Sequence, residues 1–245
     1  MRPVRRFRKL RRVIAWVLSV LLGTMPIALV AFWLTFQHKP GWYKPAGLGE
    51  SEMQQARGDA VQVADYVSDQ MVLGKAFETV LHDAAVNKWL AALPYSWPEA
   101  GRLLPPEITD LAVRFESGKV RAGAHYERNG WQAILSVGLT VSVSADGNDI
   151  SIALDGVYGG SLPVPRVVLR RMVDQLLESF STDRDLASDP LQPLASAIRN
   201  VHSAEDLFRG LRIRNRFVWF NGDRPFRIKT VDIGEGELRL QVEPL

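Results

Sequence analysis

The chain lacks cysteine altogether and has only four histidines among its 245 residues. Without cysteine there is no disulfide framework, no thiolate nucleophile and no cysteine-bound metal. The four histidines lie far apart, and none has a second histidine or an acid at the spacing of a metal-binding pair. The chain also has no G-x-S-x-G, P-loop or G-x-G-x-x-G motif. We therefore predict that the protein is not an enzyme and uses no catalytic residue, metal or cofactor.

Acidic residues are absent from the first twelve positions, where bases gather. Seven of the 30 Lys and Arg residues lie there, so the rest of the chain has 23 bases against 27 acids and a formal charge of −4. A phosphate backbone would repel such a domain, so the basic pI of about 9.3 does not indicate nucleic-acid binding. The seven bases are Arg2, Arg5, Arg6, Arg8, Lys9, Arg11 and Arg12.

No charge interrupts the 24 residues from Val13 to Phe36. A helix of that length rises about 36 Å, enough to cross a hydrocarbon core of about 30 Å. Because Lys and Arg are retained in the cytoplasm, the seven bases predict that the N-terminus is inside and that residues 37–245 are outside. A cleaved signal peptide is the alternative, but its apolar region is usually only about 7–15 residues long. Aromatic residues suited to the two membrane interfaces are Trp16 at one end and Trp33, Trp42 and Tyr43 at the other.

These features divide the chain into four parts. Residues 1–12 form a basic cytoplasmic tail, residues 13–36 a transmembrane anchor in contact with the lipid bilayer, residues 37–50 a Pro/Gly-rich spacer, and residues 51–245 one extracytoplasmic domain.

Helical periodicity recurs in several parts of the outer domain. Ser51 and Gln54 form a capping box, and a helix is expected from Glu52 to Met71. His82-Asp83 leads into a second helix that ends before Pro94. Further apolar stripes at helical spacing occupy residues 168–180 and, after Asp189-Pro190, residues 194–201.

The centre of the chain alternates with the period of two that is typical of strands. Short turns containing Gly118, Gly130 and Gly147 separate the alternating runs, which predicts an antiparallel meander of hairpins. The run from Trp131 to Val143 is long for a strand and needs a long cover. Further strands are expected over residues 76–81, 211–220, 226–233 and 238–242. The sequence therefore predicts an α+β fold, with a long, curved antiparallel meander covered by helices.

Two sets of side chains are candidate contact surfaces. Arg212, Arg214 and Arg216 share one face of a predicted strand, either as a solvated surface or as a contact for anionic lipid head groups, an acidic polymer or a protein. The apolar side of the long strand is either packed core or the wall of an apolar groove. Its residues are Trp131, Ala133, Leu135, Val137, Leu139, Val141 and Val143.

Three polar motifs have structural interpretations that we prefer. His82-Asp83 is expected to start a helix, because adjacent side chains on a helix do not face each other as an acid/base pair. The run Asp146-Gly-Asn-Asp149 is expected to be a hairpin turn rather than a calcium loop. Gly159-Gly160-Ser161 is expected to be a connecting loop rather than the site of a nucleophile.

The order of these motifs resembles the YpmS-like group of membrane-anchored bacterial proteins. The resemblance is carried by Asn87-Lys-Trp-Leu90, by Val113-Arg-Phe115 with Gly118-Lys-Val-Arg121, and by Gly160-Ser-Leu-Pro-Val-Pro165. It implies a location at the bacterial cytoplasmic (inner) membrane and an outward-facing domain with a curved sheet. Our leading hypothesis is an envelope protein whose outer domain binds a lipid or another apolar ligand. The alternatives are a scaffold for an envelope protein complex and an unrecognised hydrolase.

Overall fold

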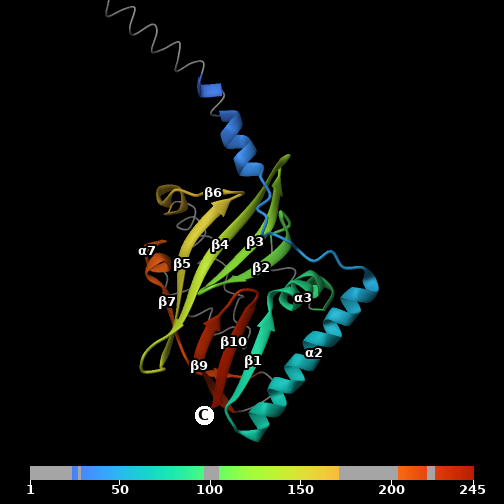
Figure 1. Ribbon diagram of the computed structural model, residues 1–245, viewed down its shortest axis with the longest axis vertical. Helices are drawn as coiled ribbons and strands as arrows, with labels where there is room; N and C mark the ends of the chain where they lie inside the picture. The colour runs from blue at the N-terminus through green and yellow to red at the C-terminus, as the bar shows by residue number, and fades with distance from the viewer. Residues whose placement is uncertain (1–23, 27–28, 97–104, 171–203, 220–223) are drawn as a thin grey trace, which may run out of the picture.

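The computed structural model describes residues 24–26, 29–96, 105–170, 204–219 and 224–245. Within them the fold is α+β and contains two antiparallel sheets with a few helices (Figure 1). The predicted α+β class with antiparallel strands is thus confirmed, and the strands form two sheets.

Helix α2 (Glu50–Leu73) is the first helix of the outer domain and is longer at both ends than predicted. Its N-cap is Gly49, whose N–H donates to Oε2 of Glu52 at 2.8 Å, so the expected capping box at Ser51 is wrong by two positions. Gly74 ends the helix in the left-handed conformation (φ 67°). The C-terminal half packs Val67 and Met71 on the four-stranded sheet.

The four-stranded sheet joins the first strand of the domain to its last strands. Its order is β1 (Phe77–His82), β10 (Glu237–Pro244), β9 (Pro225–Ile233) and β8 (Phe217–Val218). Because β1 pairs with β10 over its whole length, the two ends of the domain form one structural unit.

The six-stranded sheet contains the predicted hairpins. Its order is β2 (Ile108–Glu116), β3 (Lys119–Arg128), β4 (Trp131–Val143), β5 (Asp149–Gly159) and β6 (Leu162–Pro163), and β7 (Leu211–Arg214) pairs with the other end of β5. Gly118, Gly130 and Gly147 have positive φ at the three turns, as hairpin turns require. Figure 1 shows the long strands of this sheet running toward the N-terminal helix.

The single strand predicted over residues 211–220 is instead two short strands in different sheets. The chain changes sheets at Asn215, which is buried. Its side chain donates to the carbonyls of Gly147 (2.9 Å) and Ile228 (2.7 Å) and accepts the Ile228 N–H (2.8 Å). These bonds satisfy backbone groups that the interrupted ladder leaves unpaired.

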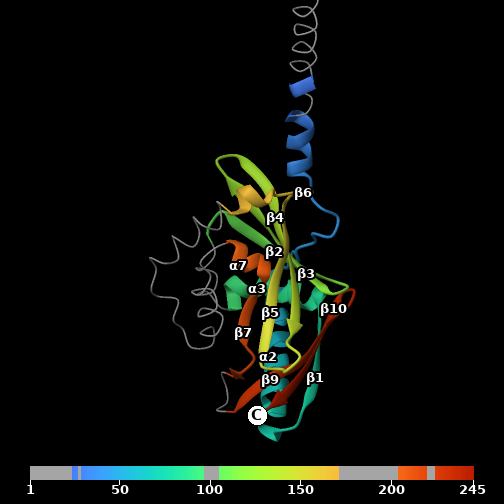
Figure 2. The same ribbon diagram turned by 90° about the vertical axis from the view of Figure 1, so that its left-hand side faces the viewer.

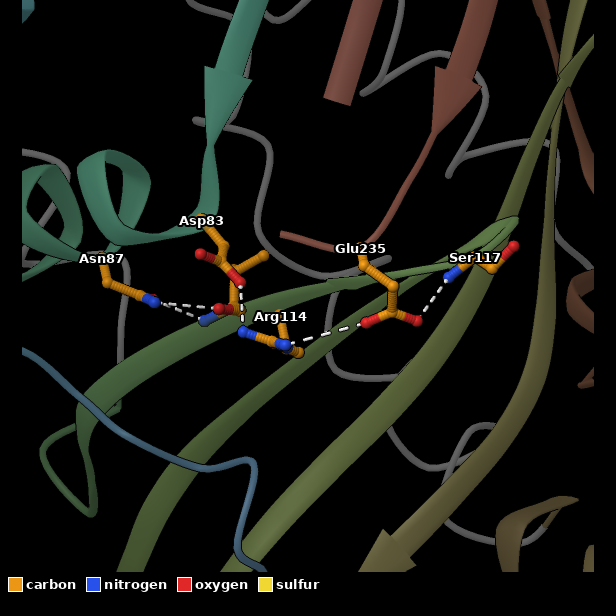
Figure 3. A network of polar contacts seen from close by, with 6 residues as sticks. Asp83, Asn87, Arg114, Ser117 and Glu235 are labelled. Carbon is orange, nitrogen blue, oxygen red and sulfur yellow. Dashed lines mark hydrogen bonds and ion pairs between the residues drawn. The ribbon is translucent and has the colours of Figure 1, made fainter. Parts of the chain in front are cut away.

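Helix α3 (Asp83–Ser96) begins directly after β1 and contains Pro94, which the sequence predicted to lie beyond its end. Asn87 binds the edge strand β2: its amide donates to the Val113 carbonyl (2.9 Å) and accepts the Val113 N–H (2.7 Å). Arg114 pairs with Asp83 (3.0 Å) and Glu235 (3.7 Å), as Figure 3 shows. This network links α3, β2 and the turn between β9 and β10.

The predicted helical cover of the long sheet is described only in part. Helix α7 (Ala204–Arg209) lies beside β5, and α3 lies beside β2. Of the stripe at 168–180, residues 168–170 are described and are helical, and the stripe at 194–201 lies outside the described residues. Figure 2 shows α7 on one side of the six-stranded sheet and the chain that follows the N-terminal helix on the other.

The predicted anchor lies largely outside the described residues. Residues 24–26 and 29–37 are helical, and no helix within the described ranges is long and apolar enough to cross a membrane. Residues that follow this helix, within the predicted Pro/Gly-rich spacer, pack against the six-stranded sheet. Tyr43 is only 2% exposed and packs against Ala112 and Ile134, so its predicted place at a membrane interface is wrong.

We expect the free energy of unfolding of the domain to fall at alkaline pH because of Tyr43. Its hydroxyl donates to the carbonyl of Asp110, and burial together with the charge of Asp110 raises the pKa of Tyr43 to about 12. A raised tyrosine pKa stabilises the fold below the unfolded value of about 10, and this contribution is lost between about pH 10 and pH 12. Urea unfolding of the wild type should therefore show a loss of about 2–3 kcal/mol over that range.

The control is Tyr43→Phe, which keeps the ring and removes the ionisable group. At neutral pH it should cost about 1–2 kcal/mol because the Asp110 carbonyl loses its donor. Its stability should fall less steeply than that of the wild type above pH 10. Parallel curves for the two proteins would contradict the assignment.

Candidate functional site

The six-stranded sheet has one face made almost entirely of apolar side chains. The register places Val120, Ala122 and Ala124 of β3 opposite Leu139, Val137 and Leu135 of β4. On the other side of β4, Val157, Leu154, Ile152 and Ile150 of β5 lie opposite Val137, Leu139, Val141 and Val143. Since side chains opposite each other share a face, these residues form one surface, which we call the apolar face.

The middle of the apolar face is only half-buried. Of the seven residues that the sequence singled out on β4, Ala133 is buried and Trp131 is 57% exposed. Leu135, Val137, Leu139, Val141 and Val143 all have intermediate exposure. Ile150 of β5, on the same face, is buried, so exposure differs along this surface.

The opposite face of β4 is buried more deeply, which alternation did not predict. Ser136 is 3% exposed, and Ile134 and Gly138 are also buried. The chain after the N-terminal helix covers them: the Trp42 ring lies against Gly123, where an added Cβ would come within 2.7 Å of it. Near Gly123, the small residues of this face therefore make room for an aromatic cover, whereas Gln132 and Ser142 toward the two ends of the strand are exposed.

The N-terminal helix ends against the apolar face. Trp33 and Trp131 form an edge-to-face pair with ring centroids 4.6 Å apart. Phe36 lies over Gly159, where a Cβ would be 2.9 Å from its Cδ2, and the carbonyl of Thr35 accepts the N–H of Ser161 at 3.3 Å. Gly159 is opposite Leu135, so Phe36 sits at one end of the apolar face. The end of the helix thus contacts one end of the apolar face through Trp33 and Phe36.

This contact explains the Gly159-Gly160-Ser161 motif. Gly160 has a φ of 59°, and an added Cβ would come within 2.7 Å of the Thr35 carbonyl. The two glycines lie where β5 ends and its connection to β6 begins, and their lack of a Cβ lets the helix backbone approach the sheet. The Ser161 N–H is engaged with the helix end.

The three predicted basic residues lie at the far end of the sheet from this helix. Arg212 and Arg214 are opposite Ser151 and Asp149, next to the turn between β4 and β5. Both are exposed, as is Arg216, while Ile213 between them is buried. No ion pair involving these three arginines is found in the part of the chain that the structure describes. Arg212 and Arg214 share a face of β7, whereas Arg216 lies after the strand ends and the chain changes sheets, so the alternation that predicted one face for all three does not extend to Arg216.

The polar motifs at Asp146 and at His82-Asp83 have structural roles. Asp146 accepts hydrogen bonds from Ser144 (2.6 Å) and Asn148 (2.8 Å), and these bonds lower the pKa of Asp146 to about 2. The motif is thus a hairpin turn, as predicted. His82 ends β1, and Asp83 starts α3. Within the described ranges, no cluster of three or more acids and histidines could hold a metal ion.

Sequence reasoning missed an aromatic and basic cluster on the covered face. The Arg121 guanidinium lies 5.5 Å from the Trp42 ring centroid and 5.8 Å from that of Tyr158, and it pairs with Glu116 at 3.1 Å. In the sequence, Arg121 stands out only as the last residue of the motif Gly118-Lys-Val-Arg121. The glycine at position 123, unusual within a strand, was the available signal of a close neighbour.

Comparison with models of protein families, with curated proteins and with solved structures finds no significant match to this chain.

We expect Gly160→Ala to separate the N-terminal helix from the sheet. An alanine at positive φ costs about 1–2 kcal/mol, and here its Cβ would also overlap the helix backbone. The matched control is Gly130→Ala, which has φ 78° and nothing within 4 Å of the added Cβ. Gly160→Ala should therefore lower the melting temperature more than Gly130→Ala.

The docking itself can be measured by chemical cross-linking, because the chain has no native cysteine. Trp33→Cys and Trp131→Cys should be joined by a short thiol-reactive cross-linker in the wild-type background and with Gly130→Ala. The yield should fall with Gly160→Ala. Equal cross-linking yields with Gly160→Ala and with Gly130→Ala would show that the position of the helix end does not depend on the close approach at Gly160.

Proposed function

We propose that the protein is a single-pass, membrane-anchored envelope protein whose outer domain binds the acyl chains of a membrane lipid on its apolar face. In this proposal residues 13–36 span the bacterial cytoplasmic membrane, the N-terminus is inside and residues 37–245 are on the extracytoplasmic side. This is the location implied by the resemblance to the YpmS-like group.

The observation that carries the proposal is the contact between the end of the helix and the apolar face. Trp33 of the helix contacts Trp131 at the start of β4, and Phe36 contacts the end of β5. A lipid chain leaving the bilayer beside the helix would meet Phe36 and Trp131, with the Arg128 side chain opposite Trp131 at the edge of the path. The position of Trp33 and Trp131 also favours lipid binding here, because indole rings suit membrane interfaces.

The dimensions and chemistry of the face suit an acyl chain. Strand β4 has 13 residues and is therefore about 43 Å long. The chains of one leaflet span about half of a hydrocarbon core of about 30 Å, so one chain fits along the strand. Each methylene removed from water contributes about 0.8 kcal/mol. The half-buried valines and leucines of β3, β4 and β5 can supply that burial.

The charge distribution argues against the anionic surface of the anchoring membrane as the main ligand. Arg212 and Arg214 lie near the turn between β4 and β5, at the opposite end of the sheet from Trp131. They would point away from the membrane that holds the helix, and electrostatic attraction to head groups fades within about 10 Å at moderate salt. An apolar ligand remains the better match for the membrane-proximal end.

We expect a photoactivatable phospholipid with a diazirine in its acyl chain to label the apolar face. The full chain would be reconstituted in nanodiscs containing this lipid, irradiated and digested. Peptides from residues 120–157 should be labelled as well as those of the anchor. Val137→Asp places a charge in the middle of the face and should lower this labelling by about fivefold or more.

The control for this experiment is Ser142→Asp, on the same strand but on its other face and exposed. It should leave the labelling of residues 120–157 unchanged. Because Val137 is only half-buried, Val137→Asp should lower the melting temperature only slightly. Labelling confined to the anchor in the wild type would reject lipid binding and favour a protein scaffold.

We expect the orientation of the anchor to follow the bases at its start. A phosphatase reporter fused after Leu245 should be active, because that enzyme folds only when exported. Neutralising Arg5, Arg6, Arg8, Lys9, Arg11 and Arg12 should reduce the activity, since these bases hold the N-terminus inside. High activity of a cytoplasmic reporter at the same position would contradict the proposed topology.

A further inference from the structure

Within the part of the chain that the structure describes, the outer edge of β1 has no neighbouring strand, and β1 is the last strand on its side of the four-stranded sheet. Asp83, opposite Gly236 in the same register, donates its N–H to the Gly236 carbonyl at 3.0 Å. In an antiparallel pair, residues alternate between bonded and non-bonded positions. Glu78, Val80 and His82 therefore point their N–H and C=O groups away from β10.

A pocket of about 640 Å³ runs along this edge. It is lined by five consecutive strand residues, Glu78 to His82, together with residues of α2 and α3. Successive side chains of a strand point to opposite faces, so a surface that touches all five lies at the strand edge. Val80 is 39% exposed there.

Helix α2 extends past the sheet on this side. Its C-terminal half packs on β10 through Val67 and Met71, whereas Val63 and Tyr66 line the pocket beside β1. Figure 1 shows α2 running diagonally beyond the β1 edge. Tyr66 is 46% exposed, and Trp89 of α3 lines the same pocket. The helices thus present apolar side chains over the place that one more strand would occupy.

We propose that this edge binds an extended segment of a partner protein, which adds a strand to the sheet beside β1. Main-chain hydrogen bonds to Glu78, Val80 and His82 hold the segment, and alternate apolar side chains contact Val63, Tyr66 and Trp89. The edge has Glu78 at one end, while His82 and the start of α3, which contributes Lys88 to the pocket, lie at the other. An antiparallel segment therefore carries a base opposite Glu78 and an acid opposite His82.

A second copy of the chain fits this edge less well. Antiparallel pairing of two β1 strands requires a two-fold axis perpendicular to the sheet, which puts both α2 helices on the same side. Each α2 would then overlap the space beyond β1 that the other already occupies. A single peptide strand meets no such obstacle.

The test uses the full chain in detergent micelles and fluorescent heptapeptides of the pattern Val-Glu-Val-Thr-Val-Lys-Val. The fourth residue is placed opposite Val80, the acid opposite His82 and the base opposite Glu78. The valine positions are varied among Val, Ile, Leu and Phe, because they face the helices. Fluorescence anisotropy measures binding, and hydrogen exchange measures protection of the Val80 amide.

Methylation of the peptide backbone gives a matched pair of probes. N-methylation of the fourth residue removes a bond to β1 and should weaken binding by about tenfold or more. N-methylation of the third residue, whose amide points away from β1, should have little effect. The exchange of the Val80 amide should slow on binding, while that of Thr79 should not change.

Variants of the edge separate this proposal from its competitors. Val80→Pro removes an outward N–H without breaking the ladder to β10 and should abolish binding, whereas Val80→Ala should retain it. If Val80→Pro does not fold, the methylated peptides still decide. Equal effects of the two methylations, no binding by any peptide of the set, or dimerisation that Val80→Pro abolishes would each overturn the proposal. Val137→Asp, which lies on the apolar face and away from the β1 edge, should leave peptide binding unchanged. The outcome for the β1 edge is therefore independent of the outcome for lipid binding.

Discussion

The contact between two hairpin tips sets the geometry of the whole domain. The N–H of Gly118, between β2 and β3, donates to the carbonyl of Ile233 at 2.8 Å, and the N–H of Gly236, between β9 and β10, donates to the carbonyl of Phe115 at 3.0 Å. Arg114, between Asp83 and Glu235, adds charge to the same joint. Backbone bonds tolerate little sliding, so this joint fixes how the two sheets lie. One sheet consequently projects toward the N-terminal helix, and the other leaves the β1 edge open.

The end of the N-terminal helix and the chain that follows it pack against the six-stranded sheet. Phe36 rests on Gly159, Trp42 on Gly123 and Tyr43 between Ala112 and Ile134. A flexible linker would let the domain move freely at a distance from the membrane. These aromatic contacts, which include the buried Tyr43, instead hold the six-stranded sheet next to the helix. If the helix continues into a bilayer, the face starts at the membrane surface, and the basic cluster on β7 points away from it.

The two candidate surfaces differ in whether their backbone hydrogen-bonding groups are already paired. The apolar face offers side chains of a sheet whose backbone groups are paired within β3, β4 and β5. Within the residues that the structure describes, the β1 edge offers backbone groups that no neighbouring strand pairs. A ligand without hydrogen-bonding groups suits the first surface, and an extended peptide suits the second. The two proposed ligands would therefore occupy separate places on the domain.

The sequence alone determined the α+β class, the hairpins and the faces on which apolar residues gather. Those features depend on local alternation and on turn residues such as Gly130, which act over a few neighbouring positions. Tertiary structure decided that Ser136 is buried while Val137 is half-exposed, because alternation separates two faces without indicating what covers each. It also decided that the strand expected over 211–220 divides at Asn215 between two sheets. Both outcomes depend on segments far away in the chain, Trp42 and Tyr43 in the first case and β9 in the second, and no local pattern encodes such partners.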